Sequence, residues 1–89
     1  MLEDFARKML ESQVDTFLKD PAKHKIFLED LGLEPTENNI IIYHAGFFTA
    51  TFAASYKVSL GRTPTEEEYT EFFDLLKRRI VEMQNAFMR

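Results

Sequence analysis

Apolar residues in the first part of the chain recur at steps of three and four, which is the period of an α-helix. The apolar positions are Leu2, Phe5, Ala6, Met9, Leu10, Val14, Phe17 and Leu18. On the polar side, Asp4 precedes Lys8 by four residues, an order of charges that supports a helix. The pattern predicts one amphipathic helix over residues 2–19.

A short second helix is predicted between a proline and a glycine. Proline suits the first position of a helix because its missing N–H needs no partner there, so Pro21 is expected to open this helix. The side chain of Asp20 can then accept hydrogen bonds from the free N–H groups of the first turn. Gly32 is expected to end the helix in the left-handed conformation. These signals place the second helix at residues 21–31.

The longest apolar stretch of the chain follows. Thr36 is expected to cap its N-terminus, and apolar or small residues then continue to Leu60 without a turn signal. Gly61 stops the run. Successive isoleucines at positions 40–42 are also compatible with a short strand. We favour a third helix over residues 37–60.

The segment 63–66, Thr-Pro-Thr-Glu, is the clearest local signal in the sequence. It predicts a capping box with Pro64 at the first helical position, followed by Glu67 and Glu68 near the positive end of the helix dipole. The apolar positions beyond it step by four and three residues, as in a heptad seam. They are Tyr69, Phe73, Leu76, Ile80, Met83 and Phe87, with Phe72 widening the stripe. A fourth helix is therefore expected over residues 64–88.

These elements predict an all-α fold in a single domain, residues 1–89. The third and fourth helices should form a long antiparallel hairpin, with the first two helices packed across it. A fourth helix of about 24 residues would be ~36 Å long, whereas a compact globule of this chain length has a diameter of about 31 Å. Because the helix overruns a monomer, we expect a dimeric bundle.

Composition supports a folded protein and argues against several classes of function. Apolar residues make up 45% of the chain and include nine phenylalanines, which is ample for a packed core. The formal net charge of -4 is the opposite of the basic surface that grips phosphate backbones, which argues against nucleic acid as a partner. The chain has no cysteine, which suits a reducing compartment, and we expect an acidic cytoplasmic protein.

Neither a membrane span nor an export signal is expected. The most apolar segment, residues 40–56, has 17 residues interrupted by polar side chains, whereas a span needs about 20 apolar residues. The chain starts with the acidic residues Glu3 and Asp4, where a signal peptide would be basic. We interpret segment 40–56 as a buried helix.

The third helix has two faces that both favour burial. At about 100° per residue, Gly46, Ala50, Ala53 and Ala54 gather on one side, and Ile41, Phe48, Phe52 and Tyr56 gather on another. One interpretation is that both faces lie in the core of a monomer, and the other is that one face meets a dimer mate or a partner helix. The residues expected at such an interface are Gly46, Ala50, Ala54, Tyr69, Phe73, Leu76, Ile80, Met83 and Phe87.

A narrow polar strip on the same helix is formed by His44, Thr51 and Ser55. It could line a ligand pocket or simply face water, and we favour water. A histidine among aromatic residues is compatible with haem or another flat cofactor, but such a residue is far more often structural. His24 has Asp20 one turn earlier, yet no second such pair completes a metal site. No cofactor or metal is therefore expected.

No pattern in the sequence indicates an enzyme, because the serines lack the glycine-flanked turn of a catalytic serine and the glycines form no phosphate loop. The sequence favours a non-enzymatic protein–protein interaction module, acting as a homodimer, adaptor or inhibitor that presents an apolar helix face. One alternative is a DNA-binding regulator of the helix-turn-helix type, against which the acidic start of the fourth helix argues. A second alternative is a ligand or haem-type sensor that uses His44.

Overall fold

The computed structural model describes residues 1–87 of the chain, which form four helices and no strand. The helices are α1 (Asp4–Lys19), α2 (Lys23–Asp30), α3 (Glu37–Leu60) and α4 (Glu66–Ala86). The expected all-α fold is confirmed, and the isoleucines at 40–42 belong to α3 rather than to a strand. The last residue that the sequence pattern assigned to the fourth helix, at position 88, lies outside the described residues.

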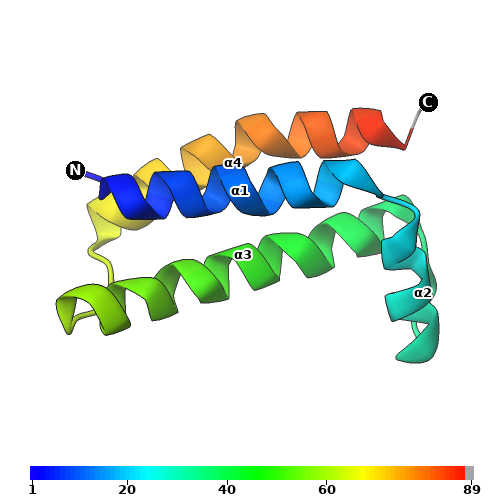
Figure 1. Ribbon diagram of the computed structural model, residues 1–89, viewed down its shortest axis with the longest axis horizontal. Coiled ribbons are helices and arrows are strands. Elements are labelled where there is room, and N and C mark those ends of the chain that lie inside the picture. The colour runs from blue at the N-terminus through cyan, green and yellow to red at the C-terminus, as the bar shows by residue number, and fades with distance from the viewer. Residues whose placement is uncertain (88–89) are drawn as a thin grey trace.

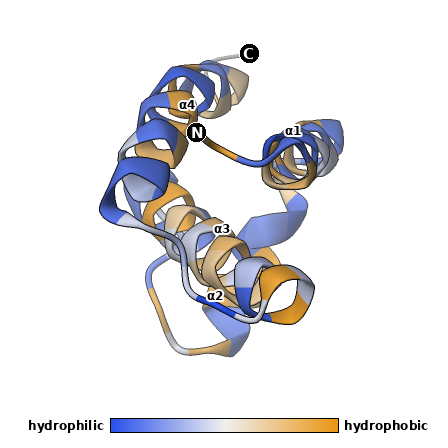
Figure 2. Ribbon diagram, turned by 90° about the vertical axis from the view of Figure 1, so that its left-hand side faces the viewer, coloured by the Kyte–Doolittle hydropathy of each residue, from blue (hydrophilic) through white to orange (hydrophobic). Residues whose placement is uncertain are grey.

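The helices α3 and α4 form an antiparallel hairpin, and α1 lies along it in contact with both (Figure 1). Seen end on, α1, α3 and α4 occupy the corners of a triangle (Figure 2). The short α2 packs against α3 at the end of the bundle far from the α3–α4 loop. The molecule is elongated: its extents are 36 × 25 × 19 Å and its Cα radius of gyration is 13.8 Å, compared with about 12 Å for a compact chain of this length.

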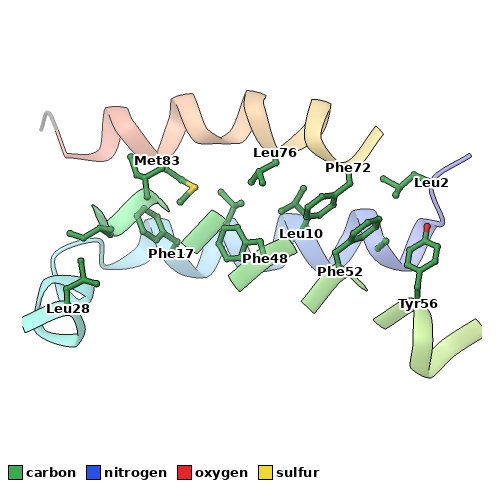
Figure 3. Close-up of a cluster of buried hydrophobic side chains, with 14 residues drawn as sticks. Leu2, Leu10, Phe17, Leu28, Phe48, Phe52, Tyr56, Phe72, Leu76 and Met83 are labelled. Atoms are coloured by element: carbon green, nitrogen blue, oxygen red, sulfur yellow. The ribbon is translucent and has the colours of Figure 1, made fainter. Parts of the chain in front are cut away.

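Three of the helices direct an apolar stripe into the space between them (Figure 3). The buried apolar residues are Leu2, Ala6, Leu10, Val14, Phe17, Leu28, Ile40, Ile41, Phe48, Phe52, Tyr56, Phe72, Leu76 and Met83. The rings of Phe52 and Phe72 stack with 4.1 Å between centroids and join the two arms of the hairpin. The only buried residue of α2 is Leu28, so α2 is held by the least apolar surface of the four helices.

Backbone geometry confirms three of the expected helix boundaries. The Thr36 hydroxyl accepts a hydrogen bond from the N–H of Asn39 at 3.1 Å and caps α3. Gly61 ends α3 with a φ of 71°, and Gly32 follows α2 with a φ of 76°. Both values lie in the left-handed region, which glycine adopts without a steric penalty.

The capping box of α4 lies two residues later than the sequence pattern suggested. Thr65 rather than Thr63 is the N-cap, and Glu68 completes the box by accepting from the N–H of Thr65 at 2.9 Å. Both threonines have a glutamate three positions later, but Glu68 also pairs with Arg62 at 2.7 Å. The ion pair favours the second box, in which the helix begins after Thr65 and Pro64 lies outside it.

The start of α2 also differs from the expectation. Ala22 is the N-cap, and no side chain caps the helix. Asp20 takes part through its backbone oxygen, which accepts from the N–H of Lys23 at 3.3 Å, and Pro21 lies in the turn rather than in the helix. A tight backbone turn therefore replaces the expected side-chain cap, and it leaves α2 only eight residues long.

The buried face of α4 is rotated relative to the predicted seam. Phe72, Leu76 and Met83 are buried, whereas Phe73 is 41% exposed and Tyr69 is only partly buried. The reason is that α1 as well as α3 packs on α4, so the inner face turns towards Phe72. The outer part of the predicted seam remains accessible beside α3.

Candidate functional site

An open groove runs between α3 and α4, and no residue of α1 contributes to it. Its volume is about 710 Å³, and it is lined by Ile42, Ala45, Gly46, Thr49, Ala50, Ala53, Tyr69, Phe73, Leu76, Lys77 and Ile80. We call it the apolar groove. Among its lining residues only Lys77 carries a charge. Accessible apolar surface of this kind is typical of sites that bind other molecules.

The groove is apolar mainly because α3 carries almost no charge. Apart from His44, the only acidic or basic residues of this helix are Glu37 in the first turn and Lys57 in the last turn. A helix that is apolar on all sides normally lies in a protein interior, yet Ile42 is 68% exposed on α3. Figure 2 shows hydrophilic colours on the outer sides of α1 and α4 and mostly pale or hydrophobic colours on α3. Even so, none of the helices within residues 1–87 has the length and apolar character needed to cross a bilayer.

Gly46 lies on the groove in the middle of α3, where glycine lowers helix stability by about 0.5–1 kcal/mol relative to alanine. Its backbone is not left-handed, and a Cβ atom added there would meet nothing within 4 Å. Neither the backbone nor the packing of the chain itself therefore requires glycine at this position. A glycine at this position would permit the close approach of a second polypeptide.

The structure divides the predicted interface residues between the groove and the core. Six of the nine line the apolar groove: Gly46, Ala50, Tyr69, Phe73, Leu76 and Ile80. Ala54 is exposed one turn further along α3, outside the groove. Met83 is fully buried in the core, and Phe87 packs against Phe17 with 5.9 Å between ring centroids. Met83 therefore has no accessible surface to offer a partner.

A second, more enclosed cavity of about 230 Å³ lies where α1, α2 and α3 meet. It is lined by Ser12, Gln13, Thr16, Phe17, His24, His44, Phe47 and Phe48, and we call it the histidine cavity. His44 is only 8% exposed, so the expectation that it faces water is wrong. The reason is that α2 packs on this part of α3 and brings the ring of His24 to 4.3 Å from that of His44, between centroids.

The packing of the two histidines favours their uncharged forms at neutral pH. Burial lowers the pKa of His44, and the nearby backbone oxygen of Ile40 opposes this only in part. Burial is also the main cause that lowers the pKa of His24, with a further lowering from His44. Because the Ile40 oxygen lies 2.8 Å from Nδ1 of His44 and can only accept, Nδ1 carries the proton and Nε2 presents a lone pair.

The structure separates the other two residues of the predicted polar strip. Thr51 lies beside the histidine cavity, where its hydroxyl accepts from the side chain of Gln13 at 2.8 Å. Ser55 donates to the backbone oxygen of Phe52 at 2.7 Å and is not among the cavity residues. No group of three or more potential metal ligands occurs within residues 1–87.

At the opposite end of α3, Glu68 is buried in a polar network. Its carboxylate accepts from the guanidinium of Arg62 at 2.7 and 3.3 Å and from the N–H of Thr65 at 2.9 Å. The pair with Arg62 is the main cause that lowers the pKa of Glu68 to about 2, against the raising effect of burial. The Tyr56 hydroxyl accepts from the N–H of Glu3 at 2.9 Å and so joins the start of α1 to α3. These contacts explain the cluster as a structural one.

Two residues of these sites, Gln13 and Glu68, were not predicted as site residues from the sequence. Gln13 lies four residues from both Met9 and Phe17, which are apolar, so its inward orientation could have been inferred from the helical period. Glu68 was assigned to the helix dipole alone, because its pairing with Arg62 requires the turn before α4 to bring the two side chains together.

Comparison with known proteins assigns no family or activity to this chain. No protein-family model, no curated protein and no solved structure matches it.

Proposed function

We propose that this protein is a non-enzymatic interaction module that forms a homodimer through the apolar groove. The observation that supports this most strongly is the groove itself, an accessible apolar surface along a helix with no charged residue between Glu37 and Lys57. Solvated helix faces normally carry charged side chains, whereas faces that meet another polypeptide are depleted in charge. The elongated shape of the chain, with a radius of gyration of 13.8 Å, leaves this surface uncovered.

The groove is lined by both bulky and small residues, which supports a twofold dimer. Both partners use the same patch in such an interface, so the patch must contain protrusions as well as recesses. On α4, Tyr69 and Phe73 are bulky and partly exposed, whereas Gly46 and Ala50 on α3 leave room for a facing side chain. In the dimer, aromatic residues of one copy would fill the recess of the other, and two hairpins would form a central four-helix bundle.

Light scattering on a sizing column tests the proposal. We expect twice the mass of one chain for the native protein and the mass of one chain for Gly46→Leu, because a leucine side chain would fill the recess. Phe73→Ser should also dissociate the dimer. Its matched control is Val81→Ser, since Val81 is 53% exposed on the same helix but lies outside the groove.

Two outcomes would contradict the proposal. One is a native protein of single-chain mass at high micromolar concentration. The other is a Gly46→Leu variant that keeps the doubled mass. Gly46→Ala further distinguishes a monomer from a dimer. In a monomer this substitution should raise the free energy of unfolding by about 0.5–1 kcal/mol and leave the measured mass at that of one chain.

A further inference from the structure

Residues that line the histidine cavity contain buried polar atoms whose hydrogen-bonding capacity is unused. Oε1 of Gln13 and both ring nitrogens of His24 are buried without a hydrogen-bond partner among residues 1–87. These are all the buried side-chain atoms of this kind in the described chain, and their residues line this one cavity. A buried polar group without a partner typically lowers stability by about 1–3 kcal/mol, so such groups are rare and call for an explanation.

The orientation of the Gln13 amide follows from its neighbours. The Thr51 hydroxyl donates its one hydrogen to the backbone oxygen of Phe48 at 3.0 Å, so it can only accept from Gln13. The Gln13 atom 2.8 Å from this hydroxyl is therefore the donor Nε2. The unpaired atom is then Oε1, an acceptor, whichever way the amide would otherwise be placed.

The two histidines add to this surplus of acceptors. With Nδ1 of His44 committed to the Ile40 oxygen, its Nε2 is an acceptor. An uncharged His24 offers one lone pair and one N–H. Neither makes a hydrogen bond of good geometry, although the backbone oxygen of Phe17 lies close enough to raise the pKa of His24 slightly against the lowering by burial. Among Gln13, His24 and His44 alone, three acceptor atoms are unused, against the His24 N–H and the second hydrogen of the Gln13 amide. These three residues therefore favour a ligand that donates a hydrogen bond.

The walls of the cavity define the rest of the ligand. Phe17 and Phe48 are almost completely buried, and Phe47, 51% exposed, stands at the opening together with the exposed residues Ser12 and Thr16. No aspartate or glutamate lines the cavity, so a cation bound there would lack a counter-charge. An engineered cavity of about 150 Å³ holds benzene, so the 230 Å³ found here suits a molecule of one or two rings rather than a tetrapyrrole.

We propose that the histidine cavity binds a small, neutral, planar ring compound that carries an N–H or O–H group and donates it to Oε1 of Gln13. This oxygen has no accessible surface in the chain alone, so binding also moves the side chains that cover it. The ring of the ligand lies among the phenylalanines, and the histidines supply further polar contacts. The cavity lies between α1, α2 and α3, and it shares no residue with the apolar groove. The site is thus separate from the proposed dimer interface.

A matched pair of probes tests this inference on the full chain. Indole has the required N–H, and benzothiophene has nearly the same shape without a donor. Calorimetric titration should show indole binding at least about tenfold more tightly than benzothiophene, the ratio expected for one buried hydrogen bond. Gln13→Leu should remove this preference, while Gln84→Leu, at an exposed position of α4, should leave it unchanged.

A second variant keeps the test independent of the stability of Gln13→Leu. Ser12 is exposed at the rim, so Ser12→Phe should preserve the fold, fill the opening and abolish binding of both probes. Equal affinity for the two probes, or an indole preference that survives Gln13→Leu, would overturn the proposal. So would the absence of indole binding at millimolar concentration, which would mean that water occupies the cavity. Zinc binding to the histidines without indole binding would also overturn it, because the site would then be a metal site.

Discussion

The two ends of the bundle each contain a buried polar cluster, and the clusters differ in how fully their atoms are paired. Near the α3–α4 loop, the Glu68 carboxylate accepts from Arg62 and Thr65, and the Tyr56 hydroxyl accepts from the backbone at the start of α1. At the other end, the histidine cavity leaves Gln13 Oε1 and both nitrogens of His24 without partners.

This difference separates a cluster that stabilises the fold from one that is available for binding. A fully paired buried network rigidifies its surroundings, whereas an unpaired one lowers stability until a ligand or water supplies the missing bonds. The helices beside the two clusters differ in the same way. The α4 start has a complete capping box, while α2 has no side-chain cap and only Leu28 in the core.

Replacing Glu68, the centre of the paired cluster, should have the largest effect on the free energy of unfolding. Glu68→Ala eliminates the capping box and the pair with Arg62, so we expect the free energy of unfolding to fall by about 2–3 kcal/mol. Urea unfolding followed by circular dichroism measures it. Glu67→Ala, one position earlier on an exposed side chain, is the matched control and should change stability by less than about 0.5 kcal/mol. Equal effects of the two variants would remove the structural role assigned to Glu68.

Leu28→Ala should weaken the unpaired end locally rather than globally. Deleting a buried leucine side chain usually lowers stability by about 2–5 kcal/mol, but here the loss cannot exceed the energy that docks α2. We expect α2 amides to exchange hydrogen faster by a factor that corresponds to about 2 kcal/mol, with little change in α4. Uniform acceleration across the chain would show that α2 and the bundle unfold as one unit.

Much of this fold could be predicted from the sequence because local signals and hydrophobic period agree along most of it. The third helix, from Thr36 to Gly61, is correct at both ends, since the cap and the stop act through neighbouring residues. The start of α4 was misplaced because two overlapping capping boxes fit the sequence, and a contact with Arg62 that the helical period does not show favours the second. The hydrophobic period identifies the apolar face of each helix well. It does not show which neighbouring helix covers that face.

The site residues show the same limit. The groove residues on α3 and α4 were predicted as one surface because they share helix faces, whereas Met83 proved to be core because α1 also packs on α4. The histidine cavity could not be predicted, because His24 and His44 are 20 positions apart and meet only when α2 folds against α3. The sequence marks the junction at Asp20 and Pro21, but it does not give the direction in which the backbone turn there places α2.

As the pH falls, the histidine end of the bundle should lose stability before the Glu68 end. The pKa values of His24 and His44 are lowered from 6.5, mainly by burial, so the unfolded state binds protons more readily and α2 docking weakens as the pH falls below 6.5. Lys23 adds to this lowering at His24, and Asp20 opposes it. The pKa of Glu68 is lowered from 4.5 to about 2, so its stabilisation is present above pH 4.5 and is lost towards pH 2.

Amide exchange and chemical shifts recorded at several pH values between 7.5 and 3 would follow this order. We expect the α2 signals to broaden or move first, while the signals of Thr65 and Glu68 remain unchanged until below pH 4.5. Loosening of the α4 start before α2 would reverse the order and contradict the comparison.

The smallest effect is expected from Gln13→Leu, and its sign is informative. The substitution removes an unpaired buried acceptor, and the Thr51 hydroxyl keeps its bond to the Phe48 oxygen. Because leucine is similar in volume and has no polar atom to desolvate, stability should stay within about 0.5 kcal/mol of the native value or rise slightly. The same urea titration measures it, with Gln84→Leu as the control. A loss comparable to that of Glu68→Ala would mean that Gln13 belongs to a fully paired network, and the distinction between the two ends would disappear.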